Sequence, residues 1–289
     1  EPSEPEHLPE DVLREAKRRC SRLRGGLIWG MLPALALVAA AVLQELEKLP
    51  SAWLDESLLR CATLGAGLLL TALACMPVWK QAASLLREGK AGCELCAAVA
   101  VLTQLICCVC GVVTGSTRAT PYAAAGALLI LACQWGLYLE ASALRNAYHL
   151  LVLNGTVPYV ASVTAAGVCR QQGTAEGFYR LCSKPDPARR WQNYALPLVL
   201  ATAAVLSGVV CFSGGNMSDF PWVLTALTTA GAGLGIPLSG ALPMYYLSRR
   251  LSRSGCAAAG YAGAKAVSRP RRLVLTLSLI HISEPTRPY

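Results

Sequence analysis

Six long apolar segments constrain this chain more than any other feature. A helix that crosses a bilayer needs about 20 consecutive apolar residues. Six segments reach that length with few or no charges: 25–43, 58–78, 93–113, 122–139, 194–212 and 220–246. Of the 289 residues, 54% are apolar and 15% are charged, which is the composition of a membrane protein. The sequence therefore predicts an all-α integral membrane protein with six transmembrane helices, arranged as three hairpins, and the lipid bilayer as its main partner.

The basic residues predict the orientation of these helices. All but four of the 26 Lys and Arg residues lie in segments 1–24, 79–92, 140–193 and 247–276. Because Lys and Arg gather on the cytoplasmic side, we expect a multi-pass protein of the plasma or inner membrane with both termini in the cytoplasm. The net charge of +9 is interpreted as contact with anionic lipid headgroups. No aromatic and basic platform for nucleic acid is visible.

The same pattern divides the chain into regions. A cytoplasmic basic arm (1–24) is either a linker from an upstream domain or a disordered tail. Transmembrane helices 1–4 (25–139) precede a small cytoplasmic insertion (140–193), and helices 5–6 (194–246) precede the start of another cytoplasmic domain (247–276). The fourth helix is expected to continue as a stalk beyond Glu140. Asn154-Gly155 indicates the turn of a small hairpin, although Pro158 weakens that prediction.

A short segment after Met76-Pro77 has two interpretations. Apolar residues from Trp79 to Leu86 are interleaved with Lys80, Gln81 and Arg87. This spacing suits an amphipathic helix on the cytoplasmic membrane surface, but an ordinary polar connection fits the periodicity equally well.

The sixth apolar segment is interrupted by glycine and proline. Pro237 cannot donate to the carbonyl of Gly233, and Pro243 cannot donate to that of Ser239. Such breaks are tolerated only where they face protein or a water-filled cavity, and interrupted helices form the ion site of many transporters. The candidate ion-path residues are Gly233, Gly235, Pro237, Ser239, Pro243 and, in the third segment, Gln104. The alternative is a proline-kinked helix that serves packing only.

The third apolar segment carries a stripe of cysteines. Cys93, Cys96, Cys107 and Cys110 fall on one face at helical spacing, with Gln104 beside them. Thiolates bind soft metals such as Cu(I) and Zn, so these cysteines are candidate metal ligands. The two pairs are roughly 20 Å apart along a helix and cannot share one ion. Cysteine is also a common packing residue. Glu94 lies on another face and is expected at the membrane interface.

The last residues differ in character from what precedes them. Residues 277–289 (LSLIHISEPTRPY) resemble the translation of a transposase-based sequencing adaptor. We interpret them as an artefactual tail and expect the natural protein to continue past Thr276.

The layout resembles the membrane half of a heavy-metal-type P-type ATPase. The run 235–243 (GIPLSGALP) stands where that family carries its Cys-Pro-Cys ion site, although no metal-binding side chain flanks Pro237 here. The basic run after Tyr246 and the segment 272–276 (RLVLT) resemble the passage into the family's phosphorylation domain. The resemblance implies a cation transporter, of a heavy metal or another small cation. It also implies that ATP and Mg are bound only by domains beyond Thr276, with a phosphorylated Asp within two residues of it.

Two functional hypotheses follow. The first is a membrane-domain fragment of a P-type ATPase-like cation transporter, truncated or degenerate. The second is a non-catalytic polytopic membrane protein with a scaffold, sensing or regulatory role. The chain contains no phosphate-binding loop, nucleophile elbow or zinc-helix motif. We therefore expect no catalytic residue and no cofactor in this segment, and leave open whether the full-length protein is an enzyme.

Overall fold

The computed structural model describes residues 9–46, 48, 57–114, 122–152, 159–164, 167–172, 178–182, 184 and 186–268. The long helices are α1 (Pro9–Glu45), α3 (Ser57–Ala74), α4 (Met76–Arg87), α5 (Cys93–Thr114), α6 (Ala123–Leu151), α8 (Pro187–Ser213), α9 (Phe220–Ala232) and α10 (Ile236–Arg253). The shorter elements are β1 (Tyr159–Thr164), β2 (Gly167–Gln172), α7 (Phe178–Cys182), a 3₁₀ turn (Met217–Asp219) and α11 (Gly260–Ser268).

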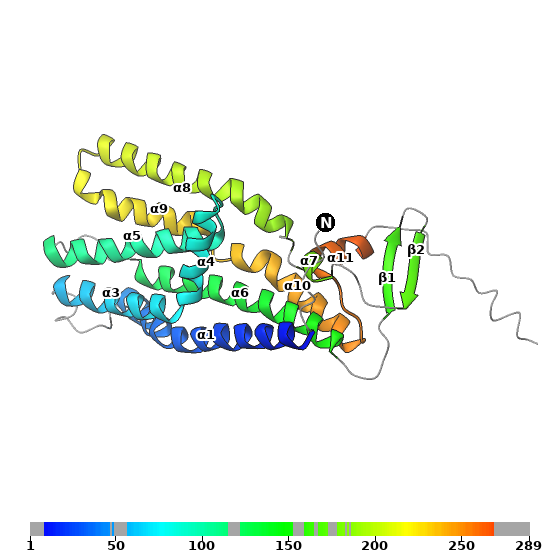
Figure 1. Cartoon of the computed structure of the whole chain (residues 1–289). Helices are drawn as coiled ribbons and strands as arrows, with labels where there is room; N and C mark the ends of the chain where they lie inside the picture. Colours follow the sequence, from blue (N-terminus) through cyan, green and yellow to red (C-terminus); the bar gives the residue numbers. More distant parts are fainter. Residues whose placement is uncertain are drawn as a thin grey trace, which may run out of the picture.

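The long helices lie side by side in an elongated bundle (Figure 1). Helix α6 is central and packs against α1, α3, α5 and α10, while α9 packs between α5 and α8. One end of the bundle carries the start of α1, the ends of α6 and α10, and the small helices α7 and α11 (Figure 1). We refer to it as the basic end because most Lys and Arg residues of the described chain lie there.

The outside of the bundle is apolar. Val113 and Phe212, for example, are 78% and 81% exposed. A large exposed apolar surface suits contact with lipid better than contact with water. Among the described residues, five helical segments are long and apolar enough to cross a membrane, or six if α3 and α4 count as one bent span. Several helices can therefore span a bilayer, as in a multi-pass membrane protein.

The second apolar segment bends sharply at Cys75. Helix α3 ends at Ala74, and α4 runs at 73° to it. The indole Nε1 of Trp79 donates to the carbonyl of Ala72 at 3.1 Å and so ties α4 back to α3. Val78 and Ala82 are buried while Lys80 is exposed. Of the two interpretations left open by the sequence, the structure supports the amphipathic helix and not the ordinary polar connection. Its place at a membrane surface stays a prediction.

The insertion differs in part from the prediction. Helix α6 does continue past Glu140, to Leu151, as the expected stalk. The hairpin, however, pairs β1 with β2, with Tyr159 opposite Gln172 and Thr164 opposite Gly167. The chain is still helical at Leu150 and Leu151, shortly before the predicted turn, and Asn154-Gly155 itself lies outside the described residues. The helical fold class is as predicted, with one small β-hairpin in the insertion, whose first strand is rich in residues that favour strands.

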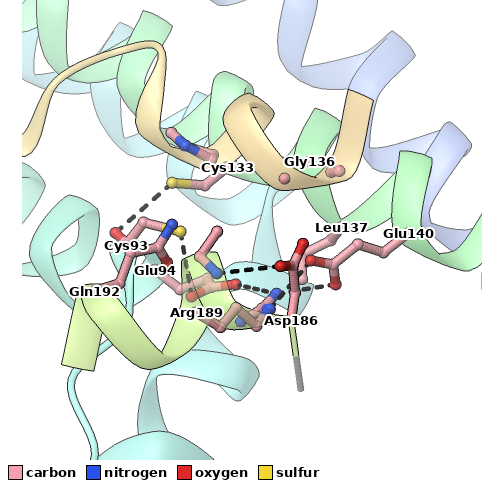
Figure 2. Close-up of a pocket in the computed structure, with 13 residues that line it drawn as sticks. Cys93, Glu94, Cys133, Gly136, Leu137, Glu140, Asp186, Arg189 and Gln192 are labelled. Carbon is pink, nitrogen blue, oxygen red and sulfur yellow. Dashed lines mark hydrogen bonds and ion pairs between the residues drawn. The ribbon is translucent and has the colours of Figure 1, made fainter. Parts of the chain in front are cut away.

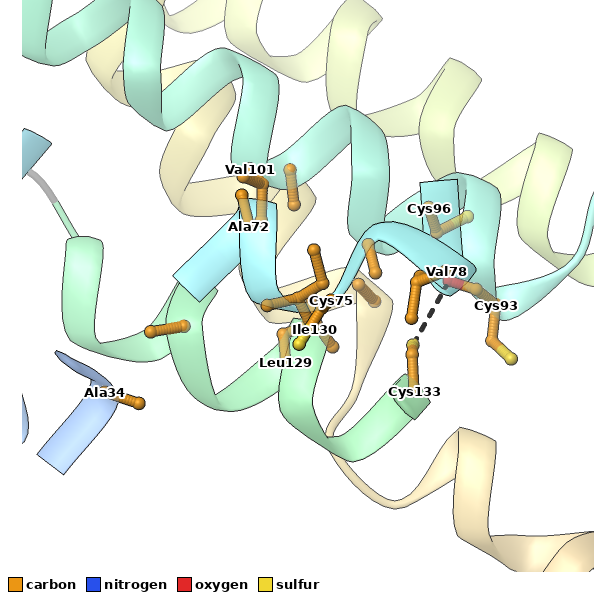
Figure 3. Close-up of a cluster of buried hydrophobic side chains, with 14 of the residues drawn as sticks. Ala34, Ala72, Cys75, Val78, Cys93, Cys96, Val101, Leu129, Ile130 and Cys133 are labelled. Carbon is orange, nitrogen blue, oxygen red and sulfur yellow. Dashed lines mark hydrogen bonds between the residues drawn. The ribbon is translucent and has the colours of Figure 1, made fainter. Parts of the chain in front are cut away.

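The core lies where α3, α4, α5 and α6 meet (Figure 3). Leu68, Val78, Cys96 and Ile130 are fully buried there. Several of their neighbours are alanine or cysteine, which lets the helix backbones approach closely. The thiol of Cys133 donates to the carbonyl of Cys93 at 3.7 Å and links α6 to the start of α5. This contact fixes the position of the residues described next.

Candidate functional site

The sixth apolar segment is broken between α9 and α10. Gly233 ends α9 with a φ of +54°, a conformation that favours glycine. Pro237 stands in the first turn of α10, where a missing N–H is tolerated. The carbonyl of Gly233, which Pro237 cannot satisfy, accepts instead from the N–H of Ile236 at 3.3 Å. Because α10 continues through Pro243, the predicted interruption is confirmed at Gly233 and is not repeated at Pro243.

The carbonyls in the first turn of α10 face protein. A Cβ atom added to Gly136 of α6 would lie 2.7 Å from the carbonyl oxygen of Pro237, so only glycine allows this approach. The carbonyl of Ile236 accepts from Nε2 of Gln192 in α8 at 3.4 Å and from the hydroxyl of Ser239 at 2.8 Å. The break therefore faces α6 and α8, as the rule for broken helices in a membrane requires.

Three charged side chains meet beside this break (Figure 2). One Nη atom of Arg189 in α8 lies 2.9 Å from Glu94 of α5 and 2.9 Å from Glu140 of α6, and its Nε donates to Glu140 at 3.1 Å. The Glu94 side chain is only 1% exposed. We refer to Glu94, Glu140 and Arg189 as the mouth cluster. It joins three helices that are far apart in the sequence.

The mouth cluster carries one net negative charge, from two carboxylates and one guanidinium. Arg189 precedes the apolar part of α8. Burial disfavours its charge, but the carboxylates of Glu140 and Glu94 outweigh this effect and raise the pKa of the guanidinium. The thiol of Cys93 also donates to Glu94, at 3.4 Å. The carboxylate of Glu94 therefore accepts from two donors, Arg189 and Cys93.

A small cavity of about 10 Å³ borders the mouth cluster and the first turns of α8 and α10. That is room for about one water molecule or small ion. Gln192, which lines it and is 5% exposed, has a buried Oε1 without a hydrogen-bond partner. A wider cavity of about 520 Å³ shares Glu140, Arg189 and Gln192 with the small one and extends toward Tyr261 of α11. The mouth cluster can thus be reached from the basic end.

A second group of polar side chains lies between α5 and α9. Gln104 donates to the hydroxyl of Thr229 at 2.8 Å, and the hydroxyl of Thr228 lies 3.5 Å from that of Thr103. We refer to these four residues as the polar layer. Gln104 is fully buried, its Oε1 is unpartnered, and any side chain at Gly126 of α6 would collide with it. The layer is about 15 Å from Glu94 along α5.

The structure separates the predicted ion-path residues into two groups. Gly233, Gly235 and Pro237 lie at the break, and Gln104 lies in the polar layer. Ser239 and Pro243 are exposed on α10 and do not line the small cavity.

The four predicted metal ligands do not share one environment. Cys93 and Cys96 are buried, Cys107 is half-buried beside Thr225, and Cys110 is exposed. In the part of the chain that the structure describes, no three His, Cys, Asp or Glu side chains come together to hold a metal ion. Metal binding by these cysteines stays a prediction.

The mouth cluster was not predicted from the sequence. The expectation that Glu94 lies at the level of the membrane interface stays a prediction, but its side chain is buried between helices and paired with Arg189. The missed signal is that Glu94, Glu140 and Arg189 each stand at the same end of an apolar segment. Side chains of opposite charge that lie at the same depth in a membrane are expected to pair with each other.

Comparisons with known proteins do not assign this chain to a family. No protein-family model matches it, and no significantly similar curated protein was found.

Proposed function

We propose that this chain is the membrane part of a small-cation transporter, and that its ion path runs through the mouth cluster, the α9–α10 break and the polar layer. One observation carries the proposal. The first carbonyls of the interrupted helix face Gly136 of α6 and Gln192 of α8, and Pro237 and Gln192 line one small cavity together with the mouth cluster. Charged residues inside a membrane bundle are costly and typically mark ion pathways.

The lining of the small cavity favours a hard cation. Its acceptors are mainly oxygens: the carboxylates of Glu94, Glu140 and Asp186, and the amide of Gln192. Oxygen ligands suit Na⁺, K⁺ or Mg²⁺, whereas soft metals prefer thiolates. Cys93 and Cys133 also line the cavity, but both thiols are engaged as donors. Within the P-type ATPase-like layout, ATP and Mg would be bound by domains that follow this membrane part.

Equilibrium cation binding by the full chain tests the proposal. The purified protein in lipid nanodiscs is titrated with Na⁺, K⁺, Mg²⁺ and Zn²⁺, and binding is followed by calorimetry and by the rise in Tm. We expect one hard cation to bind and the Glu94→Gln variant to weaken that binding at least about tenfold, since a buried carboxylate contact is lost. Glu45→Gln is the matched control, because Glu45 is exposed and lines neither of the two cavities that border the mouth cluster.

The second hypothesis, a non-catalytic membrane protein with a scaffold, sensing or regulatory role, has one observation in its favour. The hydroxyls of the polar layer bond to each other and to the helix backbone, which is also how membrane helices pack. If no cation binds to the wild-type chain, the transporter proposal fails and this alternative stands.

A further inference from the structure

A basic groove lies at the basic end of the bundle, between α1, α6 and α10. It encloses about 750 Å³ and is bordered by Lys17 and Arg24 of α1, by Arg145 and His149 of α6, and by Ser252 of α10. No carboxylate is among its lining residues. The groove therefore presents three fixed positive charges and a histidine toward one space.

These charges are largely unneutralised. Within the described residues, no ion pair is formed by Lys17 or Arg24, and Arg145 donates only to its neighbour Asn146, at 3.2 Å. By contrast, Arg189 of the mouth cluster has two carboxylate partners. Unpaired cations facing each other repel, so the groove is electrostatically suited to an anion.

The walls of the groove are held in place. The thiol of Cys20 lies 3.9 Å from the hydroxyl of Ser142, which joins α1 to α6. The hydroxyl of Ser248 donates to the carbonyl of Ala143 at 2.8 Å, which joins α10 to α6. The positive charges are thus brought together by packing and are not merely scattered over a surface.

The groove also has an apolar part that continues toward the membrane span. One face of α1 carries Lys17, Arg24 and Ile28 at helical spacing. Ile28 and Tyr138 line the groove beside Gly25, which is the first residue of the first apolar segment. Ile28 and the adjacent Trp29 are both exposed. An exposed tryptophan at this level is typical of a membrane interface.

From this combination we propose that the basic groove binds the headgroup phosphate of an anionic phospholipid, with an acyl chain along Ile28 and Tyr138. Basic pockets between membrane helices on the positively charged side recognise such headgroups. The cationic part and the apolar part lie in the order that a phospholipid presents them. This proposal is independent of cation transport.

The test measures lipid binding to the full chain in a neutral detergent by native mass spectrometry. The probes are phosphatidylglycerol and phosphatidylserine, with phosphatidylcholine as the neutral lipid. Wild-type protein should retain the two anionic lipids and not phosphatidylcholine. The double variant Arg24→Gln/Arg145→Gln should weaken their binding roughly 25-fold, since each Lys or Arg near an anionic headgroup contributes about fivefold.

The matched control is Arg18→Gln/Arg22→Gln. It removes the same charge from exposed positions of α1 that do not line the groove, and anionic lipid binding should stay within about twofold of wild type. If this control loses as much affinity as the groove variant, binding is diffuse adsorption and the proposal is overturned.

A further experiment distinguishes a phospholipid from a free phosphate ion as the ligand of the groove. Ile28→Ser should weaken phosphatidylglycerol binding without changing binding of inorganic phosphate, because only the lipid has an acyl chain to contact that side chain. If inorganic phosphate binds as tightly as the lipid, or if Ile28→Ser has no effect, the groove is not a phospholipid site.

Discussion

Arg189 balances two carboxylates that would otherwise repel each other inside the bundle. Replacing it by glutamine leaves Glu94 buried without a cation, and an uncompensated buried charge costs about 3–5 kcal/mol. We therefore expect Arg189→Gln to lower the free energy of unfolding by roughly 3 kcal/mol, measured by denaturation in detergent. The double variant Arg189→Gln/Glu94→Gln should recover a large part of this loss. A single variant as stable as wild type would show that the pair is not buried.

Only some residues of the candidate ion path could be predicted from the sequence. Gly233, Gly235 and Pro237 could be found because backbone breaks are encoded locally, by φ preference and a missing donor. The pairing of Arg189 with Glu94 could not be read from periodicity, because the two residues are 95 positions apart. Their meeting depends on how α5 and α8 pack around α6.

Between elements, the close approach of α6 and α10 depends on Gly136. A Cβ at this position would lie 2.7 Å from the carbonyl oxygen of Pro237. Gly136→Ala should therefore force the helices apart and cost about 1–3 kcal/mol of stability, seen as a lower Tm in detergent. Gly208→Ala in α8 is the control, because nothing lies within 4 Å of its added Cβ, and it should be neutral or slightly stabilising. Equal loss in both variants would contradict this packing.

Helices were predicted more reliably than the hairpin. The apolar segments are largely helical, as their length and hydropathy predict, with breaks at Cys75 and between Ala232 and Ile236. The predicted turn at Asn154-Gly155 lies outside the described residues, and the hairpin that the structure describes pairs Tyr159–Thr164 with Gly167–Gln172. The start of α8 at Pro187 was not predicted although the sequence signals it, because Asp186 is a favoured N-cap, whose carboxylate accepts from the N–H of Ala188 at 3.1 Å, and proline is favoured in the first turn.

For the whole molecule, the charge distribution predicts which end faces the cytoplasm. In a background without the 13 cysteines, Asn216→Cys should react with a membrane-impermeant maleimide on intact cells. Lys184→Cys should react only after permeabilisation, because it lies in the insertion at the basic end. Both positions are exposed, so access to the reagent depends on the side of the membrane. Labelling of residue 184 from outside would overturn the six-span topology.

Helix α6 runs unbroken through 29 residues and borders every site described above. Gly126 accommodates Gln104, Glu140 belongs to the mouth cluster, and Arg145 lines the basic groove. The cation path and the basic groove therefore share one element. Thermodynamic reciprocity then applies: if a bound headgroup changes the affinity for the cation, the cation changes the affinity for the headgroup by the same factor.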